Sequence, residues 1–245
     1  MQQQIIIDQQ FNGPPHSGNG GYVAGAFATA VGGPCEVTLI KPPPLDTPLD
    51  IRPEADATYG LYAGDDIVAK ARETQPRDNK LPFVAYEAAI EAGRRGLKTR
   101  EATDVFTSCF VCGPDREPDD GLRLFAGDVS APSGSESAGH AAVDWQPSAA
   151  FSHDGTHIAP EFVWSALDCP SAAAIGVATG EAQSILLGRL DVGISRVPAV
   201  DERCVIVSKM SGQERRKIFS DVSLFSQRGE VLASGLATWI EVSFD

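Results

Sequence analysis

The chain has few basic residues and no long apolar run. Its 245 residues include 20 Lys and Arg against 33 Asp and Glu, so the formal net charge is -13. This negative charge repels phosphate backbones and anionic lipid headgroups, which argues against nucleic acid and membrane surfaces as partners. No apolar stretch approaches the roughly 20 residues that a membrane-spanning helix requires. We therefore expect a soluble globular protein without a membrane partner.

Cysteine is also scarce. The five cysteines, at positions 35, 109, 112, 169 and 204, are odd in number and scattered along the sequence. This pattern does not predict a disulfide framework and fits a reducing compartment. The first eight residues carry no basic residue ahead of a short isoleucine run, so no secretory signal is predicted. We expect a cytoplasmic protein with free thiols.

Several catalytic and cofactor motifs are missing. The sequence has no Gly-x-Ser-x-Gly elbow, no glycine-rich phosphate loop and no dinucleotide fingerprint, which excludes serine hydrolases, kinases and Rossmann enzymes. Cys109 and Cys112 have the spacing of a zinc pair, but no second Cys-x-x-Cys or paired histidine follows them. A structural zinc ion needs four ligands. We therefore predict no metal and no cofactor, and interpret the two cysteines as packing residues, with metal binding as the weaker alternative.

An internal similarity suggests two related halves. Residues 61–71 resemble residues 224–235, and each segment has the pattern of two strands joined by a turn rich in glycine and acidic residues. An alanine-rich helical segment precedes each pair of strands, at residues 20–31 and 160–178. We therefore predict an N-terminal half over residues 1–100 and a C-terminal half over residues 101–245. The alternative is a chance similarity between two ordinary hairpins.

Two further features concern the helices. Residues 82–96 have the apolar spacing of an amphipathic helix, which we expect to end at its Gly-Arg-Arg-Gly sequence. In the second alanine-rich helix, Pro170 should disrupt the backbone, because a proline ring inside a helix removes a hydrogen bond and clashes with the preceding turn.

The order of these elements resembles the hot-dog fold, in which a curved antiparallel sheet wraps one long helix. Residues 109–114 (CFVCGP), followed by residues 121–124 (GLRL), resemble a signature of many thioesterase-like hot-dog proteins. The Gly20-Gly21 pair resembles the loop-to-helix turn of the phenylacetyl-CoA thioesterase type, and residues 237–242 resemble a typical last strand. The resemblance covers most of the chain and implies an α+β double hot-dog fold. It also implies acyl-CoA or another acyl thioester as the partner, and it leaves a homodimer open.

Thioester hydrolysis needs donors that stabilise the charge developing on the carbonyl oxygen, with a base or nucleophile placed opposite. Unpaired amides at a helix N-terminus are such donors. Asn19 is a good cap for the first helix, and Gly20 and Gly21 let a ligand approach the backbone closely. The second helix begins with Pro160 and Glu161, whose carboxylate would repel an anionic transition state. Only the first helix end is therefore expected to be open.

The resemblance implies that the acid comes from the other half. In the phenylacetyl-CoA thioesterase type, an acidic residue eight positions past the histidine of a His-Gly-Gly turn acts as base or nucleophile with a glycine amide of the neighbouring subunit. Asp168 lies eight positions past Pro160 and matches that place, whereas the corresponding residue of the first half is Phe27. The resemblance thus implies one composite site whose catalytic residues are Asp168, Gly20 and Gly21. The predicted substrate-binding residues are Asn19, His16, Tyr22, His157, Glu161 and Trp164.

Other functions stay open. The family has a histidine in the turn where this chain has Asn19, which favours a non-catalytic acyl or acyl-CoA-binding protein as an alternative. A further alternative is a relative of hot-dog enoyl-CoA hydratases, suggested by Asp154 and His157. Those enzymes place the histidine five residues after the aspartate, whereas here the two are three apart. Asp168 also has a structural alternative, in which it only satisfies backbone amides near Pro170.

Overall fold

The computed structural model describes residues 3–243, apart from residues 76, 79, 104, 130–138 and 182. The N-terminal half contains β1 (Gln3–Ile6), α1 (Gly20–Val31), β2 (Cys35–Leu39), β3 (Pro48–Pro53), β4 (Thr58–Ala63) and β5 (Asp66–Glu73). After α2 (Tyr86–Glu101), the C-terminal half contains β6 (Gly127–Asp128), β7 (Ala141–Trp145), α3 (Pro160–Thr179), β8 (Ile185–Ile194), β9 (Cys204–Glu214), β10 (Lys217–Ser226) and β11 (Val231–Glu241). Short 3-10 helices occupy Gln9–Phe11 and Ala149–Phe151.

The two halves have the same topology. All strands join one antiparallel sheet in the order β1-β3-β4-β5-β2-β8-β11-β10-β9-β7-β6. The N-terminal half therefore runs β1-β3-β4-β5-β2, and the C-terminal half repeats this order as β7-β9-β10-β11-β8. The two halves meet where β2 pairs with β8. The segments that are similar in sequence form the last hairpin of each half, in which Leu61 pairs with Ala69 and Leu224 pairs with Ala233.

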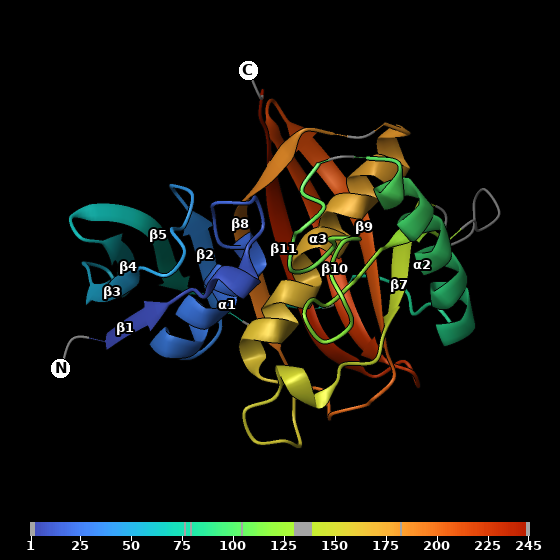
Figure 1. The fold of residues 1–245 in the computed structure, drawn as a ribbon, viewed down its shortest axis with the longest axis horizontal. Helices are drawn as coiled ribbons and strands as arrows, with labels where there is room; N and C mark the ends of the chain where they lie inside the picture. The colour runs from blue at the N-terminus through green and yellow to red at the C-terminus, as the bar shows by residue number, and fades with distance from the viewer. Residues whose placement is uncertain are drawn as a thin grey trace.

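α1 and α3 lie side by side in front of the sheet (Figure 1). Along the chain, α1 connects β1 to β2 and α3 connects β7 to β8. α1 begins where the Asn19 side chain accepts a hydrogen bond from the Tyr22 amide and ends at Gly32, whose φ of 85° favours glycine. α3 ends at Gly180 in the left-handed conformation. The helices bury large side chains such as Phe27 and Leu167 against the sheet, and each full burial contributes about 1.5–3 kcal/mol.

Two glycines allow α1 and α3 to pack closely. A Cβ placed on Gly21 would lie 2.5 Å from the Cβ of Asp168, and one placed on Gly25 would lie 2.6 Å from the Cβ of Trp164 and 2.7 Å from the Cα of Glu161. Real Cβ atoms do not approach one another so closely, so a side chain at either position would separate the helices. The Gly-x-x-x-Gly spacing places both gaps on the same face of α1.

α2 is longer than the sequence predicts. It starts at Tyr86 rather than residue 82 and continues to Glu101 through both glycines that were expected to end it. Gly96 is a packing residue, because a Cβ there would lie 2.5 Å from the carbonyl oxygen of Ala126. α2 packs on β7 and β6, so the predicted boundary near residue 100 falls inside a helix that contacts the C-terminal half. That boundary stays a prediction.

Pro170 does not break α3, contrary to the expectation from sequence. The helix runs through it from Pro160 to Thr179. Nearby hydroxyl groups bind the backbone carbonyls: Ser171 Oγ donates to the carbonyl of Asp168 over 2.6 Å, and Ser208 Oγ donates to the carbonyl of Pro170 over 2.7 Å. The bonds lie next to the proline in the buried part of α3, where packing in the core offsets the missing backbone donor.

The apolar surface of the strands is largely covered. In β9, alternate side chains face two separate clusters: Ile206 packs in the core under α3, whereas Val205 and Val207 pack with Ala89 of α2.

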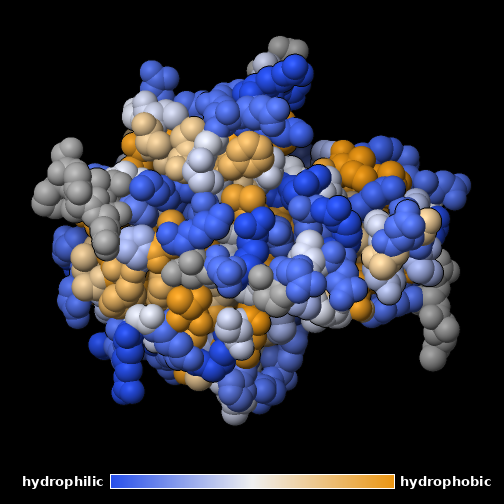
Figure 2. All heavy atoms as spheres, turned by 180° about the vertical axis from the view of Figure 1, so that it is seen from behind, coloured by the Kyte–Doolittle hydropathy of each residue, from blue (hydrophilic) through white to orange (hydrophobic). Residues whose placement is uncertain are grey.

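α3 is long and apolar enough to cross a membrane by length and composition, and 61% of its apolar window is buried inside the fold. Seen from behind, the surface is mostly hydrophilic, with hydrophobic side chains in separate patches (Figure 2).

The helix contact predicts a specific stability effect. We expect Gly25→Ala to lower the free energy of unfolding by about 1–3 kcal/mol, because the new methyl group overpacks the contact with Glu161 and Trp164. Gly176→Ala is the matched control, because a Cβ at that position of α3 has no neighbour closer than 3.6 Å. It should leave stability unchanged or raise it by up to about 1 kcal/mol. Urea denaturation of the three proteins measures both effects, and equal losses would contradict the packing argument.

Candidate active site

Asp168 of α3 lies against the N-terminus of α1. Its Oδ2 accepts a hydrogen bond from the Gly21 amide over 3.0 Å and another from Asn19 Nδ2 over 2.8 Å. Asn19 Oδ1 accepts a hydrogen bond from the Tyr22 amide over 2.9 Å and so caps the helix. Asn19 and Asp168 are each only 2% exposed. The acid of one half is thus bound to the helix end of the other half.

The pKa of the Asp168 carboxyl is raised from its ordinary value to about 7. Burial is the main cause, the Cys109 thiol adds to it, and the hydrogen bonds from Gly21 and Asn19 act in the opposite direction. A carboxyl with a pKa near neutrality can both accept and release a proton at neutral pH.

Two groups at this helix end remain available for a ligand. Asp168 Oδ1 is buried and has no hydrogen-bond partner among the described residues. The Gly20 amide, the first of α1, donates no hydrogen bond in the part of the chain that the structure describes. The expected pair of glycine amides therefore divides into two roles, since the amide of Gly21 binds the acid while that of Gly20 stays unused.

The helix end opens onto a cavity of about 880 Å³. Asn19, Gly20 and Asp168 line it together with apolar side chains such as Leu39, Leu187 and Trp239. Ligand cavities in proteins have volumes of about 300–1,000 Å³ and are mostly apolar with a few polar groups. This cavity has the size and lining that an acyl chain requires.

Comparisons with known proteins address the fold. No protein-family model matches the chain, and the search of curated proteins gives no match. A solved "putative thioesterase" of Novosphingobium aromaticivorans is 14% identical, with a TM-score of 0.57, and the match covers 98% of this chain and 95% of that one. A protein of unknown function with a hot dog fold, from Alicyclobacillus acidocaldarius, is 13% identical, with a TM-score of 0.53 and coverage of 99% and 93%. The chain has a double hot-dog fold.

A third solved structure is similar over nearly the whole double hot-dog. It is a TesB protein of Mycobacterium avium subsp. paratuberculosis, with 10% identity, a TM-score of 0.59 and coverage of 92% of this chain and 88% of that one. At such identities the likeness concerns the fold. The predicted α+β double hot-dog fold is confirmed.

Six of the predicted site residues lie outside the cavity lining, among them Gly21, whose amide binds Asp168. Tyr22 is buried and stacks on Phe11, with ring centroids 3.9 Å apart. Trp164 is buried against Gly25 where the helices cross. Both point into the core because they lie on faces of α1 and α3 that pack inward, so the structure does not place them as substrate contacts.

The charged and polar predictions at the second helix end also lie elsewhere. Glu161 is buried and contacts His153, with 2.5 Å between Oε1 and Nε2. His16 is exposed, and His157 lies on an exposed turn where Asp154 accepts its backbone amide over 2.7 Å. Asp154 thus has a structural role in the turn, and neither it nor His157 lines the cavity as the hydratase alternative would require.

Sequence reasoning missed a cluster of three thiols beside Asp168. The Sγ atoms of Cys109, Cys112 and Cys169 lie within 4.8 Å of one another. Cys169 directly follows Asp168 in α3, so the fold brings it to the Cys-x-x-Cys pair from 57 residues away along the chain. Hydrogen bonds from the Cys112 and Cys169 thiols hold the pKa of Cys109 well below its ordinary value.

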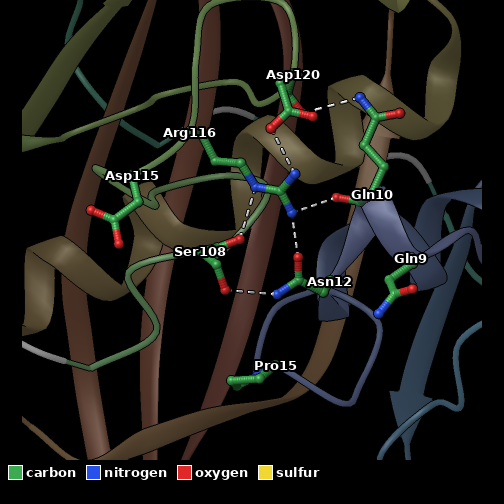
Figure 3. Close-up of a pocket in the computed structure, with 8 residues that line it drawn as sticks. All are labelled: Gln9, Gln10, Asn12, Pro15, Ser108, Asp115, Arg116 and Asp120. Atoms are coloured by element: carbon green, nitrogen blue, oxygen red, sulfur yellow. Dashed lines mark hydrogen bonds and ion pairs between the residues drawn. The ribbon is translucent and has the colours of Figure 1, made fainter.

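The loop that carries Cys109 and Cys112 is anchored by Arg116 (Figure 3). Its guanidinium donates to the carbonyls of Ser108 and Gln10 over 2.9 and 2.8 Å, forms an ion pair with Asp120 at 2.8 Å, and contacts the side chain of Asn12. Arg116 thus fastens the loop to the segment that precedes α1.

Basic side chains at the cavity were missed as well. Lys41, Arg95 and Arg100 line it. Arg100 is occupied by backbone carbonyls, among them those of Cys112 at 3.2 Å and Val105 at 2.8 Å. Arg95 donates to the carbonyl of Asp128 over 2.7 Å and is partly exposed. Four basic residues between positions 94 and 100 were the available signal.

The contact between Asn19 and Asp168 predicts the effect of two matched substitutions. Asn19→Ser and Asn19→Asp both keep a capping oxygen, but Asn19→Asp also places a second carboxylate beside Asp168. We expect Asn19→Asp to be less stable than Asn19→Ser at neutral pH by about 1–3 kcal/mol. Because protonation of a carboxyl removes the repulsion, the difference in the free energy of unfolding should shrink as the pH falls. Urea denaturation at neutral and at acidic pH measures this difference. A difference that is independent of pH would refute electrostatic coupling at this site.

Proposed function

We propose that this double hot-dog protein hydrolyses acyl thioesters, with acyl-CoA as the substrate class. One observation carries the proposal: Asp168 of α3 is bound by the Gly21 amide and by Asn19 at the N-terminus of α1, and both Asp168 and Asn19 line a mostly apolar cavity. A buried acid beside a helix N-terminus combines a base with donors for a developing oxyanion. The similar solved structures include a putative thioesterase, which is consistent with thioester hydrolysis.

In the proposed reaction, the acyl chain lies in the cavity and the thioester carbonyl faces the N-terminus of α1. Asp168 Oδ1 takes a proton from a water molecule, and the resulting hydroxide adds to the carbonyl carbon. The Gly20 amide donates to the oxyanion that forms, aided by the positive end of the helix dipole. The carbon–sulfur bond then breaks, and the proton held by Asp168 passes to the departing thiolate, which gives a carboxylic acid and a free thiol. Asn19 positions the acid throughout.

A second candidate function is acyl-CoA binding without hydrolysis. The observation that favours it is that the Gly21 amide is already occupied by Asp168, which leaves the Gly20 amide as the single expected donor at this helix end. An oxyanion hole with one donor stabilises less charge than one with two. Both candidates use the same cavity, and they differ only in whether the bound thioester is cleaved.

The central prediction concerns Asp168. We expect the purified protein to hydrolyse members of a panel of short, aromatic and long acyl-CoA thioesters, and Asp168→Asn to lower kcat by roughly 10²–10⁴-fold, because the amide cannot accept the proton. Release of the free thiol, followed with a thiol reagent, gives the rate. Asp144→Asn serves as the control, because Asp144 is also a partly buried carboxyl with a raised pKa but does not line the cavity.

The outcomes separate the two candidates. Activity that survives Asp168→Asn would refute the proposed base and keep the fold. If no thioester is cleaved although acyl-CoA binds in the micromolar range by calorimetry, the chain is a binding protein.

A further prediction concerns the nucleotide end of coenzyme A. Arg95 lies at the cavity on α2 and is partly exposed, so it is suited to contact a phosphate group. We expect Arg95→Gln to raise KM for acyl-CoA by roughly 3–10-fold, the effect of one polar contact. The same variant should leave KM unchanged for an acyl thioester of N-acetylcysteamine, which has no phosphate. Arg94→Gln is the control, since Arg94 pairs with Glu91 on the solvent side of α2. Equal changes for both substrates would exclude a phosphate contact.

A further inference from the structure

We propose that Cys109, Cys112 and Cys169 form a binding site for one thiophilic divalent metal ion of the zinc class, with the fourth coordination position taken by a water molecule or an added ligand. The site joins the loop at the start of the C-terminal half to α3. It is a second function of this region, distinct from the thioester chemistry proposed above.

The spacing of the sulfur atoms fits a metal ion. Two thiolates on one tetrahedral zinc ion, each with a Zn–S bond of about 2.3 Å, are about 3.8 Å apart. Cys109 Sγ and Cys169 Sγ are 3.8 Å apart, and Cys112 Sγ lies within 4.8 Å of both. A disulfide bond needs about 2.05 Å between the sulfurs. The three thiols surround a point that a zinc ion could occupy with little movement.

A second, independent observation indicates that a ligand is missing at this place. Asp168 Oδ1 is buried without a hydrogen-bond partner among the described residues, and a buried carboxylate oxygen left unpaired is costly. Asn19 Nδ2 contacts both Asp168 Oδ2 at 2.8 Å and Cys109 Sγ at 3.8 Å, so the carboxylate lies next to the thiols. A water molecule bound to the metal ion would offer that oxygen a hydrogen-bond donor.

The ligands are held in place by the fold. The Gly113 amide donates to the carbonyl of Cys109 over 2.8 Å and closes a tight turn between the two loop cysteines. A Cβ on Gly113 would lie 2.5 Å from the carbonyl oxygens of Cys109 and Thr107, so the turn requires glycine. Arg116 fastens the same loop, and Cys169 is fixed by the buried helix α3. Such preorganisation removes most of the ordering cost of metal binding.

The surrounding charge also fits. Three thiolates and a divalent ion carry a net charge of -1, which a nearby cation would stabilise. Arg100 Nε donates to the carbonyl of Cys112 over 3.2 Å and lines the same cavity. The other two cysteines do not share this environment, because Cys35 lies in β2 and Cys204 in β9, outside the cluster.

The test measures metal binding with no acyl substrate present, so its result is independent of the hydrolysis assay. Protein reduced and stripped with a chelator is titrated with Co²⁺ alone, and thiolate-to-cobalt charge-transfer absorption is recorded before Zn²⁺ is added in competition. We expect one equivalent of Co²⁺ to bind and Zn²⁺ to displace it. Cys112→Ser and Cys169→Ser should each weaken binding at least about 10- to 100-fold, since even changes behind the ligands cost that much.

Cys204→Ala is the matched control, because Cys204 is buried in β9 outside the cluster. It should bind Co²⁺ like the unchanged protein, and circular dichroism shows which variants are folded. If the reduced unchanged protein gives no charge-transfer absorption, the metal site is refuted, whatever the variants do. A thiol count of three instead of five before reduction, together with no cobalt binding after it, would identify a disulfide pair in place of a metal site.

Discussion

The close contact between α1 and α3 is the constraint on which the candidate site depends. Asp168 reaches the Gly21 amide because neither Gly21 nor Gly25 has a side chain to separate the helices. The contact has a cost, since glycine in a helix interior is less favourable than alanine by about 1 kcal/mol at each position. Tighter packing of the two halves and the hydrogen bonds to the buried acid offset that cost. Changes at the helix crossing therefore act on stability and on the site together.

The two halves share a topology but differ at their helix ends. α1 starts at Asn19 and two glycines and faces the cavity, whereas α3 starts at Pro160 and Glu161, and Glu161 contacts His153. In a symmetric pair each helix end would face an acid of the other helix. Here the ninth residue of α1, which corresponds to Asp168 as the ninth residue of α3, is the buried Ala28; the count from sequence that gave Phe27 was one residue off, because α1 starts at Gly20 and not at Asn19. Because the two halves are covalently linked, one half can lose the acid while the other loses the open helix end, and the pair still has one of each.

Local signals in the sequence marked the starts of two helices and two hairpins, and the resemblance to hot-dog thioesterases implied one long-range contact. The Asn19 cap and the Pro160 start marked the beginnings of α1 and α3, and the hairpin similarity marked two strand pairs in equivalent places. Other features depend on tertiary neighbours. Gly96 continues a helix because the backbone of Ala126 lies against it, and Cys169 joins the loop thiols only once α3 has packed. No periodicity in the sequence encodes either contact.

The polar side chain of Asp168 lies in the buried interior of the molecule. An apolar residue in place of Asp168 would need no partners, whereas the carboxylate needs Asn19, the Gly21 amide and a group for its second oxygen. Stability alone therefore does not account for the acid. Its neighbours, an unused helix amide on one side and three thiols on the other, are groups that act on ligands. Because Asn19 contacts the carboxylate and the Cys109 thiol, the geometry of both neighbourhoods is set by one side chain.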